Sequence, residues 1–257
     1  MVSVDLPGAP NFRLDGKRVL VTGASRGIGA AAASSLAACG ADVVLVSRNA
    51  GDVSAIAEEI CRSGGRASAR ALDVTDSAAV NRMAIEEAPF DVLVSSAGTN
   101  RPKPFTEVTE DDYDAVMSLN VRATFFVAQA IARRMIQGER RGSIINISSQ
   151  MGHVGGKTRT VYCCSKFAVE GLTKAMAIDL APHGIRVNTL CPTFIETAMT
   201  RSYFSDERFR NDVVSKIKLG RIGVVEDITG ALVYLASDAS SLVTGSSLLV
   251  DGGWTAD

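Results

Sequence analysis

The chain has 257 residues, of which 46% are hydrophobic and 21% are charged, and its formal net charge at pH 7 is −1. This composition is typical of an ordinary globular protein, with one large α/β domain or two small ones. The near-neutral charge argues against a nucleic-acid partner, and no apolar run approaches the roughly 20 residues of a membrane span.

The first 13 residues contain two prolines and are expected to form a loose leader. They lack the basic and apolar segments of a secretory signal, so we expect a cytoplasmic protein. None of the five cysteines forms a CxxC pair, which is typical of reduced thiols in that compartment. The two histidines, His153 and His183, show no metal-ligand spacing, and we expect no metal site.

From residue 14 onward, short β-branched runs alternate with Ala-rich helical stretches. Most of these runs are nearly all apolar, which is typical of parallel strands covered on both faces. The predicted strands are Arg18–Thr22, Asp42–Ser47, Ala67–Leu72, Asp91–Ser95, Ser143–Ser148, Ile185–Leu190 and Ser246–Val250. The predicted helices include Ile28–Cys39, Val53–Ser63, Asp112–Ile136 and Tyr162–Leu180. This rhythm predicts a Rossmann-type doubly wound α/β fold, with a seven-stranded parallel sheet, helices on both faces and a single domain over residues 14–257.

A polar and aromatic stretch, Thr193–Lys216, interrupts this rhythm between the last two predicted strands. Irregular connections of this kind carry binding groups and can close over a ligand. We therefore expect a substrate lid over about residues 193–216.

The first predicted strand runs into the sequence GASRGIG, residues 23–29, and then into a helix. Glycines let the backbone approach a pyrophosphate, whose charge is favoured at a helix N-terminus. The spacing is GxxxGxG rather than GxGxxG, but its place between the first strand and the first helix predicts a dinucleotide-binding turn. The residues of this turn expected to bind the cofactor are Gly23, Ser25, Arg26, Gly27, Ile28 and Gly29.

The second predicted strand ends at Ser47 and Arg48, where an NAD site usually carries an acidic residue. A carboxylate would repel a 2′-phosphate, whereas a guanidinium and a hydroxyl bind one. Arg26 can reach the same phosphate, although each arginine taken alone could equally be a solvated surface charge. Together they predict NADP as the cofactor, with NAD as the alternative.

Ser149, Tyr162 and Lys166 form a candidate catalytic set. Tyr162 and Lys166 share one face of a helix, so the ammonium could lower the pKa of the phenol from its ordinary value near 10. Ser149 ends an apolar strand, at the sheet edge where open α/β folds bind ligands. The set predicts a tyrosine that exchanges a proton with a substrate oxygen.

Along almost its whole length, the sequence resembles the short-chain dehydrogenase/reductase family. The matching motifs are TGASRGIG (22–29), LDV (72–74), SSAG (95–98), the Asn120 of SLNV, ISS (147–149), YCCSK (162–166), RVN (186–188), CPTFIET (191–197) and the terminal VDGGW. The resemblance implies hydride transfer between a nicotinamide and a carbonyl or secondary alcohol.

The resemblance also implies residue roles. Ser149 would hold the substrate oxygen, Tyr162 would donate or accept the proton, Lys166 would also bond the nicotinamide ribose, and Asn120 would anchor a water that extends the proton relay. The further cofactor residues are Asp73, Val74, Ala97, Gly98, Tyr162, Lys166, Pro192, Ile195 and Thr197. The candidate substrate contacts are Ser149, Gln150, His153, Tyr162 and Thr193.

Three positions depart from the family pattern. Ser96 stands where the family has a second Asn, Cys164 where it has a smaller residue, and Thr193 where it has Gly. None of the three removes a reacting group, so they bear on the cleft and the lid rather than on the reaction class.

The expected substrate is a small polar sugar, polyol or sugar acid. The alternative is a 3-oxoacyl group on an acyl carrier protein. Relatives that act on carriers have two arginines where the acidic carrier docks, whereas this chain has Arg140 at one of these places and His183 at the other. A mostly neutral histidine attracts an acidic carrier less than an arginine does, so this alternative is less favoured. Another class, a non-catalytic NADP-binding regulator, need not keep Tyr162. The family also implies a homotetramer built on the two longest helices and the last strand.

Overall fold

A parallel sheet of seven strands forms the centre of the computed structural model, which describes residues 8–256 except 198, 199 and 202. The strand order is β3-β2-β1-β4-β5-β6-β7, and each neighbouring pair is parallel. The strands are β1 (Arg18–Thr22), β2 (Asp42–Ser47), β3 (Arg66–Ala71), β4 (Val92–Ser95), β5 (Ser143–Ile147), β6 (Arg186–Pro192) and β7 (Ser247–Val250). This arrangement confirms the predicted doubly wound fold.

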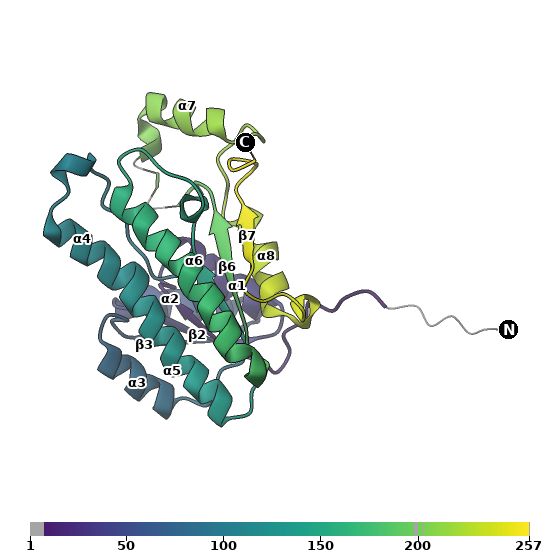
Figure 1. Ribbon diagram of the computed structural model, residues 1–257. Coiled ribbons are helices and arrows are strands. Elements are labelled where there is room, and N and C mark those ends of the chain that lie inside the picture. Colours follow the sequence, from purple (N-terminus) through teal and green to yellow (C-terminus); the bar gives the residue numbers. More distant parts are fainter. Residues whose placement is uncertain (1–7, 198–199, 202, 257) are drawn as a thin grey trace.

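Helices cover both faces of the sheet (Figure 1). One apolar core joins the sheet to α1 (Gly27–Ala38), α2 (Ala50–Arg62) and α8 (Glu226–Ala236). The other core joins it to α3 (Ser77–Glu86), α5 (Thr124–Gln137) and α6 (Thr160–Leu180). Along β1, Val19 and Val21 enter the first core and Leu20 enters the second. Because strand side chains alternate between faces, a strand buried on both sides must be apolar throughout.

The predicted helix Asp112–Ile136 is built from three pieces. These are α4 (Glu110–Met117), a six-residue π-helical turn (Ser118–Ala123) and α5. Together, Glu110–Gln137 is long and apolar enough to cross a membrane, but half of its most apolar window is buried inside the protein. Many of its apolar side chains, including Val127, Ile131 and Met135, pack in the second core, as expected of a core helix.

The order in which strands are added to the sheet reverses at β1: β2 and β3 lie on one side of it, and β4 to β7 lie on the other. Open α/β folds bind ligands beside such a switch point, at the carboxyl ends of the strands. The remaining helix, α7 (Glu207–Lys216), stands beyond this edge, next to the C-terminus (Figure 1). At the other end of the chain, residues 8–13 are exposed, and Leu14 is the first buried residue.

Candidate active site

The loop between β1 and α1 packs so closely against neighbouring backbone that two of its positions admit only glycine. Gly23 has a φ of +66°, and a Cβ on it would lie 2.8 Å from the Ala97 backbone. A Cβ on Gly29 would lie 2.3 Å from the Gly23 carbonyl oxygen. Arg26, at the N-terminus of α1, makes no side-chain cap, and the first turn of that helix holds no acid. The first N–H groups of α1 are therefore suited to an anion such as a pyrophosphate.

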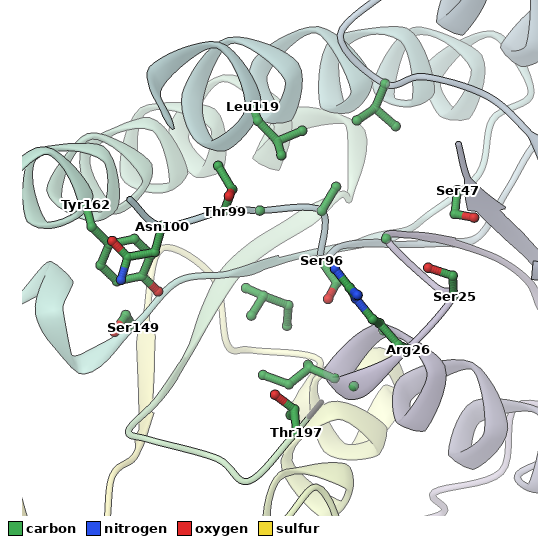
Figure 2. A pocket seen from close by; sticks show the side chains of 18 of the residues that line it. Ser25, Arg26, Ser47, Ser96, Thr99, Asn100, Leu119, Ser149, Tyr162 and Thr197 are labelled. Atoms are coloured by element: carbon green, nitrogen blue, oxygen red, sulfur yellow. The ribbon is translucent and has the colours of Figure 1, made fainter. Parts of the chain in front are cut away.

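A cavity of about 1310 Å³ runs past this loop along the carboxyl ends of β1 to β6. Its reacting end holds Ser149, Tyr162 and Asn100, and Ser25, Arg26 and Ser47 lie at the opposite end (Figure 2). The predicted cofactor residues on its wall are Gly23, Ser25, Arg26, Gly27, Ile28, Gly29, Ser47, Arg48, Asp73, Val74, Ala97, Gly98, Tyr162, Lys166, Pro192, Ile195 and Thr197. The fold thus gathers the whole predicted cofactor set on one surface.

The end of the cavity beyond β2 carries the charges expected to select the cofactor. Arg26 and Arg48 both line it. The Asp73 carboxylate accepts hydrogen bonds from the N–H and hydroxyl of Thr75. Those bonds, with a smaller effect of the Arg48 charge, hold the pKa of Asp73 below its ordinary value. Asp52 also lines the cavity, an acid that the sequence analysis does not weigh.

Asn120 lies one layer behind the cavity, in the π-helical turn, and is 1% exposed. Its Oδ1 accepts from the Thr99 N–H at 2.8 Å, and its Nδ2 donates to the Thr99 carbonyl at 2.9 Å and to Ser165 Oγ at 3.0 Å. Asn120 therefore fastens the loop after β4 to α6. Its role toward a relay water stays a prediction.

The catalytic set meets at the reacting end of the cavity. Ser149 follows β5, and its Oγ donates to Gln150 Oε1 at 2.7 Å. Lys166 Nζ donates to the Ile147 carbonyl at 2.8 Å and lies 5.5 Å from the centroid of the Tyr162 ring. All three side chains line the cavity.

The charges in this set differ from the sequence-based expectation. Burial raises the pKa of Tyr162 to about 12, against the opposing effects of a hydrogen bond with Ser149 and of the Arg159 charge. Burial also lowers the pKa of Lys166 to about 8. The expectation that Lys166 lowers the pKa of the phenol is therefore not met in the protein alone, where desolvation raises that pKa.

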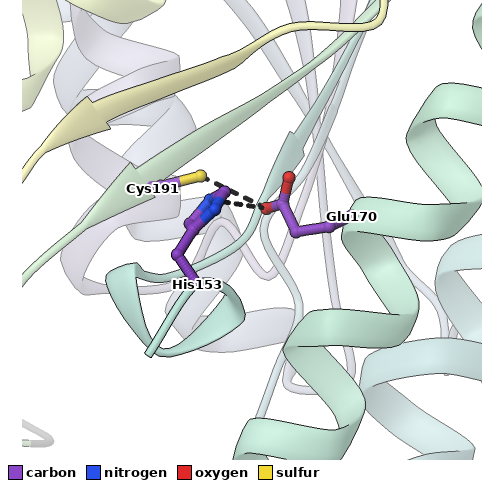
Figure 3. Close-up of side chains that lie close together, drawn as sticks. All are labelled: His153, Glu170 and Cys191. Atoms are coloured by element: carbon purple, nitrogen blue, oxygen red, sulfur yellow. Dashed lines mark hydrogen bonds and ion pairs between the residues drawn. The ribbon is translucent and has the colours of Figure 1, made fainter. Parts of the chain in front are cut away.

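The structure gives His153 a partner away from the cavity. Gln150 and Thr193 line the cavity, as expected of substrate contacts, but His153 does not. Its Nε2 lies 3.7 Å from Oε1 of the buried Glu170, because the 3-10 turn Gln150–Gly152 directs it toward α6 (Figure 3). His153 therefore lies outside the cavity wall of this structure, and its contact with substrate stays a prediction.

Glu170 is the centre of a buried polar cluster. Its Oε1 accepts from Cys191 Sγ at 3.3 Å, and its Oε2 accepts from Thr189 at 2.9 Å and Ser247 at 2.6 Å. The potential ligand atoms of His153, Glu170 and Cys191 lie within 4.8 Å of one another, a grouping of three separate elements that sequence spacing does not reveal. The cluster ties α6, which carries Tyr162 and Lys166, to β6 and β7.

Two of the departures from the family pattern border the cavity. Ser96 lies on the wall, and its backbone N–H is held by Thr22 Oγ1 at 3.1 Å. The Oγ1 of Thr193 is buried and has no hydrogen-bond partner among the residues that the structure describes. Since buried hydroxyls are normally paired, this oxygen suits a bond to a ligand in the cavity.

The predicted lid contains an aromatic cluster. Phe194 lines the cavity, and its ring lies 5.7 Å from those of both Phe209 and Trp254 and 6.1 Å from that of Phe204. The α7 helix begins there, capped by Asp206. The side chain of Tyr203 lies outside the described residues. Closure of the segment stays a prediction.

Leu119 and Arg122 also line the cavity, and sequence reasoning did not assign them to the site. Arg159 precedes α6 and is 6% exposed. Leu119 belongs to the π-helical turn, whose position depends on packing. The sequence offers Arg159, with Asn100 and Arg101, as a polar group in the loops expected over the pocket, and all three line the cavity.

Comparisons with known proteins agree with this site. The family model described as "Enoyl-(Acyl carrier protein) reductase" matches residues 23–255. Gluconate 5-dehydrogenase of Gluconobacter oxydans (strain 621H) is 44% identical over 248 residues, which cover 95% of this chain and 96% of that protein. L-xylulose reductase of Bos taurus is 39% identical over 252 residues, covering 96% and 99% of the two chains.

A solved structure of gluconate 5-dehydrogenase from Burkholderia cenocepacia J2315, in complex with NADP and tartrate, superposes with a TM-score of 0.93. It is 38% identical and covers 96% of this chain and 98% of its own. Likeness of this extent, in a chain that gathers a glycine turn, a serine, a tyrosine and a lysine around one cavity, makes the protein a member of the short-chain dehydrogenase/reductase family and an oxidoreductase acting on CH–OH groups or their carbonyls.

Proposed function

We propose that the protein interconverts a secondary alcohol and its ketone with NADP(H), on a small polar sugar, polyol or sugar acid. The observation that carries this proposal is the single cavity that joins the glycine turn to Ser149, Tyr162 and Lys166. Relatives named gluconate 5-dehydrogenase, L-xylulose reductase and D-threitol dehydrogenase support the substrate range.

The choice of NADP rests on three residues of this chain. Arg26, Ser47 and Arg48 line the cavity beyond β2, where guanidinium groups favour a phosphate. Relatives of known structure were crystallised with NADP. The glycine turn, uncapped at α1, suits the pyrophosphate.

The chain's own groups account for the proton transfer. Bound NADP(H) would supply or accept the hydride. Ser149 Oγ would hold the substrate oxygen, and the Tyr162 phenol, kept protonated by burial, would donate its proton during reduction and take it back during oxidation. Lys166, positioned by the Ile147 carbonyl, would hold the nicotinamide ribose beside them.

The alternative substrate, a 3-oxoacyl group on a carrier protein, has weaker support. Arg140, which would attract an acidic carrier, lies 3.5 Å from Asp91 and shares its charge with that carboxylate. His183, near it, is a weaker cation than arginine. The activity screen described below therefore includes a 3-oxoacyl thioester as the competing substrate.

We further propose a single domain over residues 14–257 that assembles as a cytoplasmic homotetramer. Phe125 on α5, Phe167 and Ile178 on α6, and Leu249 on β7 are 42%, 50%, 75% and 39% exposed, and apolar side chains on these elements suit subunit contacts. Ala130 is buried in the core, so it is not available for such a contact. Light scattering at micromolar concentration tests the assembly, and a monomer would contradict it.

The activity test is a screen read by nicotinamide absorbance with NADP(H) and NAD(H). The substrates are neutral ketoses and polyols, keto sugar acids and aldonic acids, and a 3-oxoacyl thioester. Turnover of sugar-type substrates with the larger kcat/KM supports the proposal. A clear preference for the thioester would replace it with the carrier-linked activity.

A further inference from the structure

Arg159 is a buried cation at the reacting end of the cavity. It is 6% exposed, lines the cavity, and immediately precedes α6, three residues before Tyr162. Its backbone carbonyl accepts from the Cys163 N–H at 2.8 Å, which fixes it to the first turn of the helix. A guanidinium keeps its charge at any ordinary pH, so burial at this point places a permanent positive charge beside the substrate space.

The charge of Arg159 reaches the reacting hydroxyl. It opposes the effect of burial on the pKa of the Tyr162 phenol, and both residues line the cavity. Among the contacts of the guanidinium is a hydrogen bond from Nη1 to Thr158 Oγ1 at 3.0 Å.

Acidic side chains are unevenly distributed along the cavity. Among the described residues, the acids on its wall are Asp52 and Asp73, which lie beyond β2 and β3 at the cofactor end. The described residues around the reacting end are neutral or cationic: Asn100, Arg101, Ser149, Gln150, Met151, Arg159, Tyr162, Lys166, Thr193 and Phe194. Such a wall favours an anionic substrate over a neutral one.

Arg101 is less suited to bind the anion. Its side chain is 41% exposed, and its Nη1 lies 2.5 Å from Asp111 and 3.5 Å from Asp112. Those carboxylates largely neutralise its charge. Arg159 is only 6% exposed, and it is the better candidate for a desolvated contact because charged hydrogen bonds gain strength away from water.

We propose that Arg159 binds the carboxylate of the substrate, and that the enzyme acts on sugar acids and their keto acids rather than on neutral sugars and polyols. This inference rests on the proposed function and narrows it. The planar guanidinium would hold the carboxylate with paired hydrogen bonds, at a fixed distance from Ser149 and Tyr162. The carboxylate itself is unchanged by the reaction, so the contact positions substrate in both directions.

The test compares 5-keto-D-gluconate with D-fructose, a neutral six-carbon ketose, in the NADPH-dependent reduction. The native enzyme should prefer the keto acid. Arg159→Gln should lower kcat/KM for the keto acid by about tenfold to a hundredfold, the usual value of a charge-assisted bond, and leave the value for fructose within about threefold. Arg159→Lys should restore part of the loss, because it keeps the charge without the planar fork.

Lys103 provides the matched control. It is a nearby cation whose backbone N–H donates to the Thr158 carbonyl, and its Nζ pairs with Asp112 at 2.6 Å. It does not line the cavity. Lys103→Gln should therefore keep the preference for the keto acid. Thermal unfolding and NADPH titration by fluorescence verify that each variant folds and binds the cofactor.

Direct binding separates the inference from the proposed function. Calorimetric titration of D-gluconate into the NADP complex should show at least about tenfold weaker binding in Arg159→Gln than in the native enzyme. Equal affinity in the two proteins, or a native preference for fructose that Arg159→Gln leaves unchanged, overturns the inference. Failure of every sugar, polyol and sugar acid to react would instead overturn the proposed function. If Arg159→Gln does not fold, the same titration with Arg159→Lys decides the matter, and unchanged affinity there again overturns the inference.

Discussion

Asn120 and Thr99 are paired by two hydrogen bonds, in which one side-chain amide satisfies both backbone groups of one residue. The Thr99 N–H donates to Oδ1 at 2.8 Å, and Nδ2 donates to the Thr99 carbonyl at 2.9 Å. The π-helical turn presents the amide to this loop. A bond from Nδ2 to Ser165 Oγ at 3.0 Å extends the connection to α6, so Asn120 sets the distance between the loop after β4 and the helix that carries Tyr162 and Lys166.

Asn120→Ala should reduce both stability and turnover. The change removes three buried hydrogen bonds, at about 1 kcal/mol each, and should lower Tm by roughly 6–12 °C in a chain of this size. We expect kcat to fall at least about tenfold, because a displaced reacting group costs rate steeply. Calorimetry and the rate assay measure the two effects.

Thr124→Val is the control for Asn120, since it removes a single buried hydrogen bond, from Thr124 Oγ1 to the Asn120 carbonyl at 2.8 Å. It should cost about a third as much stability and leave kcat nearly unchanged. If Asn120→Ala lost stability but kept its full kcat, the residue would be structural only and its positioning role would be refuted.

Tyr162→Phe should nearly abolish turnover while cofactor binding survives. The phenol is the proposed proton donor, a contribution worth about a hundredfold to ten-thousandfold, but its hydroxyl adds little to dinucleotide affinity. Lys166→Ala should lose both turnover and cofactor binding, because the Nζ of Lys166 lies beside the Tyr162 ring and the residue lines the cavity. NADPH titration by fluorescence, run beside the rate assay, distinguishes the two variants. Substantial activity in Tyr162→Phe would contradict the assignment of Tyr162 as the proton donor.

Arg48→Ala should shift the cofactor preference toward NAD(H). Loss of a charge-assisted phosphate contact costs about 1.5–3 kcal/mol, or roughly tenfold to a hundredfold in affinity. In the variant, kcat/KM with NADPH should fall by this roughly tenfold to hundredfold factor. The value with NADH should change little, because NADH lacks the 2′-phosphate. A native enzyme that uses NADH as well as NADPH would contradict the proposed role of Ser47 and Arg48.

The stability of the cofactor-free protein should rise with pH through the titration of Lys166. Burial lowers the pKa of Lys166 to about 8 from 10.5. Between these values the unfolded chain holds a proton that the folded chain has released, so raising the pH favours the folded state. From pH 7.5 to 9.5, the titration of Lys166 should raise the free energy of unfolding by about 2 kcal/mol at most.

Comparison of the native protein with Lys166→Met isolates this effect. Urea unfolding at the two pH values should show the gain in the native protein only. The comparison is needed because Cys191, whose pKa is raised to about 12 by burial, contributes with the opposite sign above pH 9. Parallel pH dependence in the two proteins would show that Lys166 stays charged when buried.

The sequence determined the sheet and the glycine turn and predicted the candidate catalytic set, because each depends on local pattern. Apolar runs marked β1 and β2 at their observed bounds. The spacing of Tyr162 and Lys166 placed both on one helix face, and the position of Ser149 after an apolar run placed it at the carboxyl edge of the sheet. These inferences need only the periods of helix and strand and the parallel direction of the chain.

The tertiary structure alone decided the features that depend on contacts between distant segments. The contact between His153 and Glu170 joins the turn after β5 to α6. The π-helical turn that positions the side chain of Asn120 leaves no periodic signal in the sequence. The balance between burial and the Arg159 charge at the Tyr162 phenol, and the burial of Arg159 itself, are likewise set by surrounding elements. Desolvation is a property of packed neighbours, so it appears only when the chain is folded.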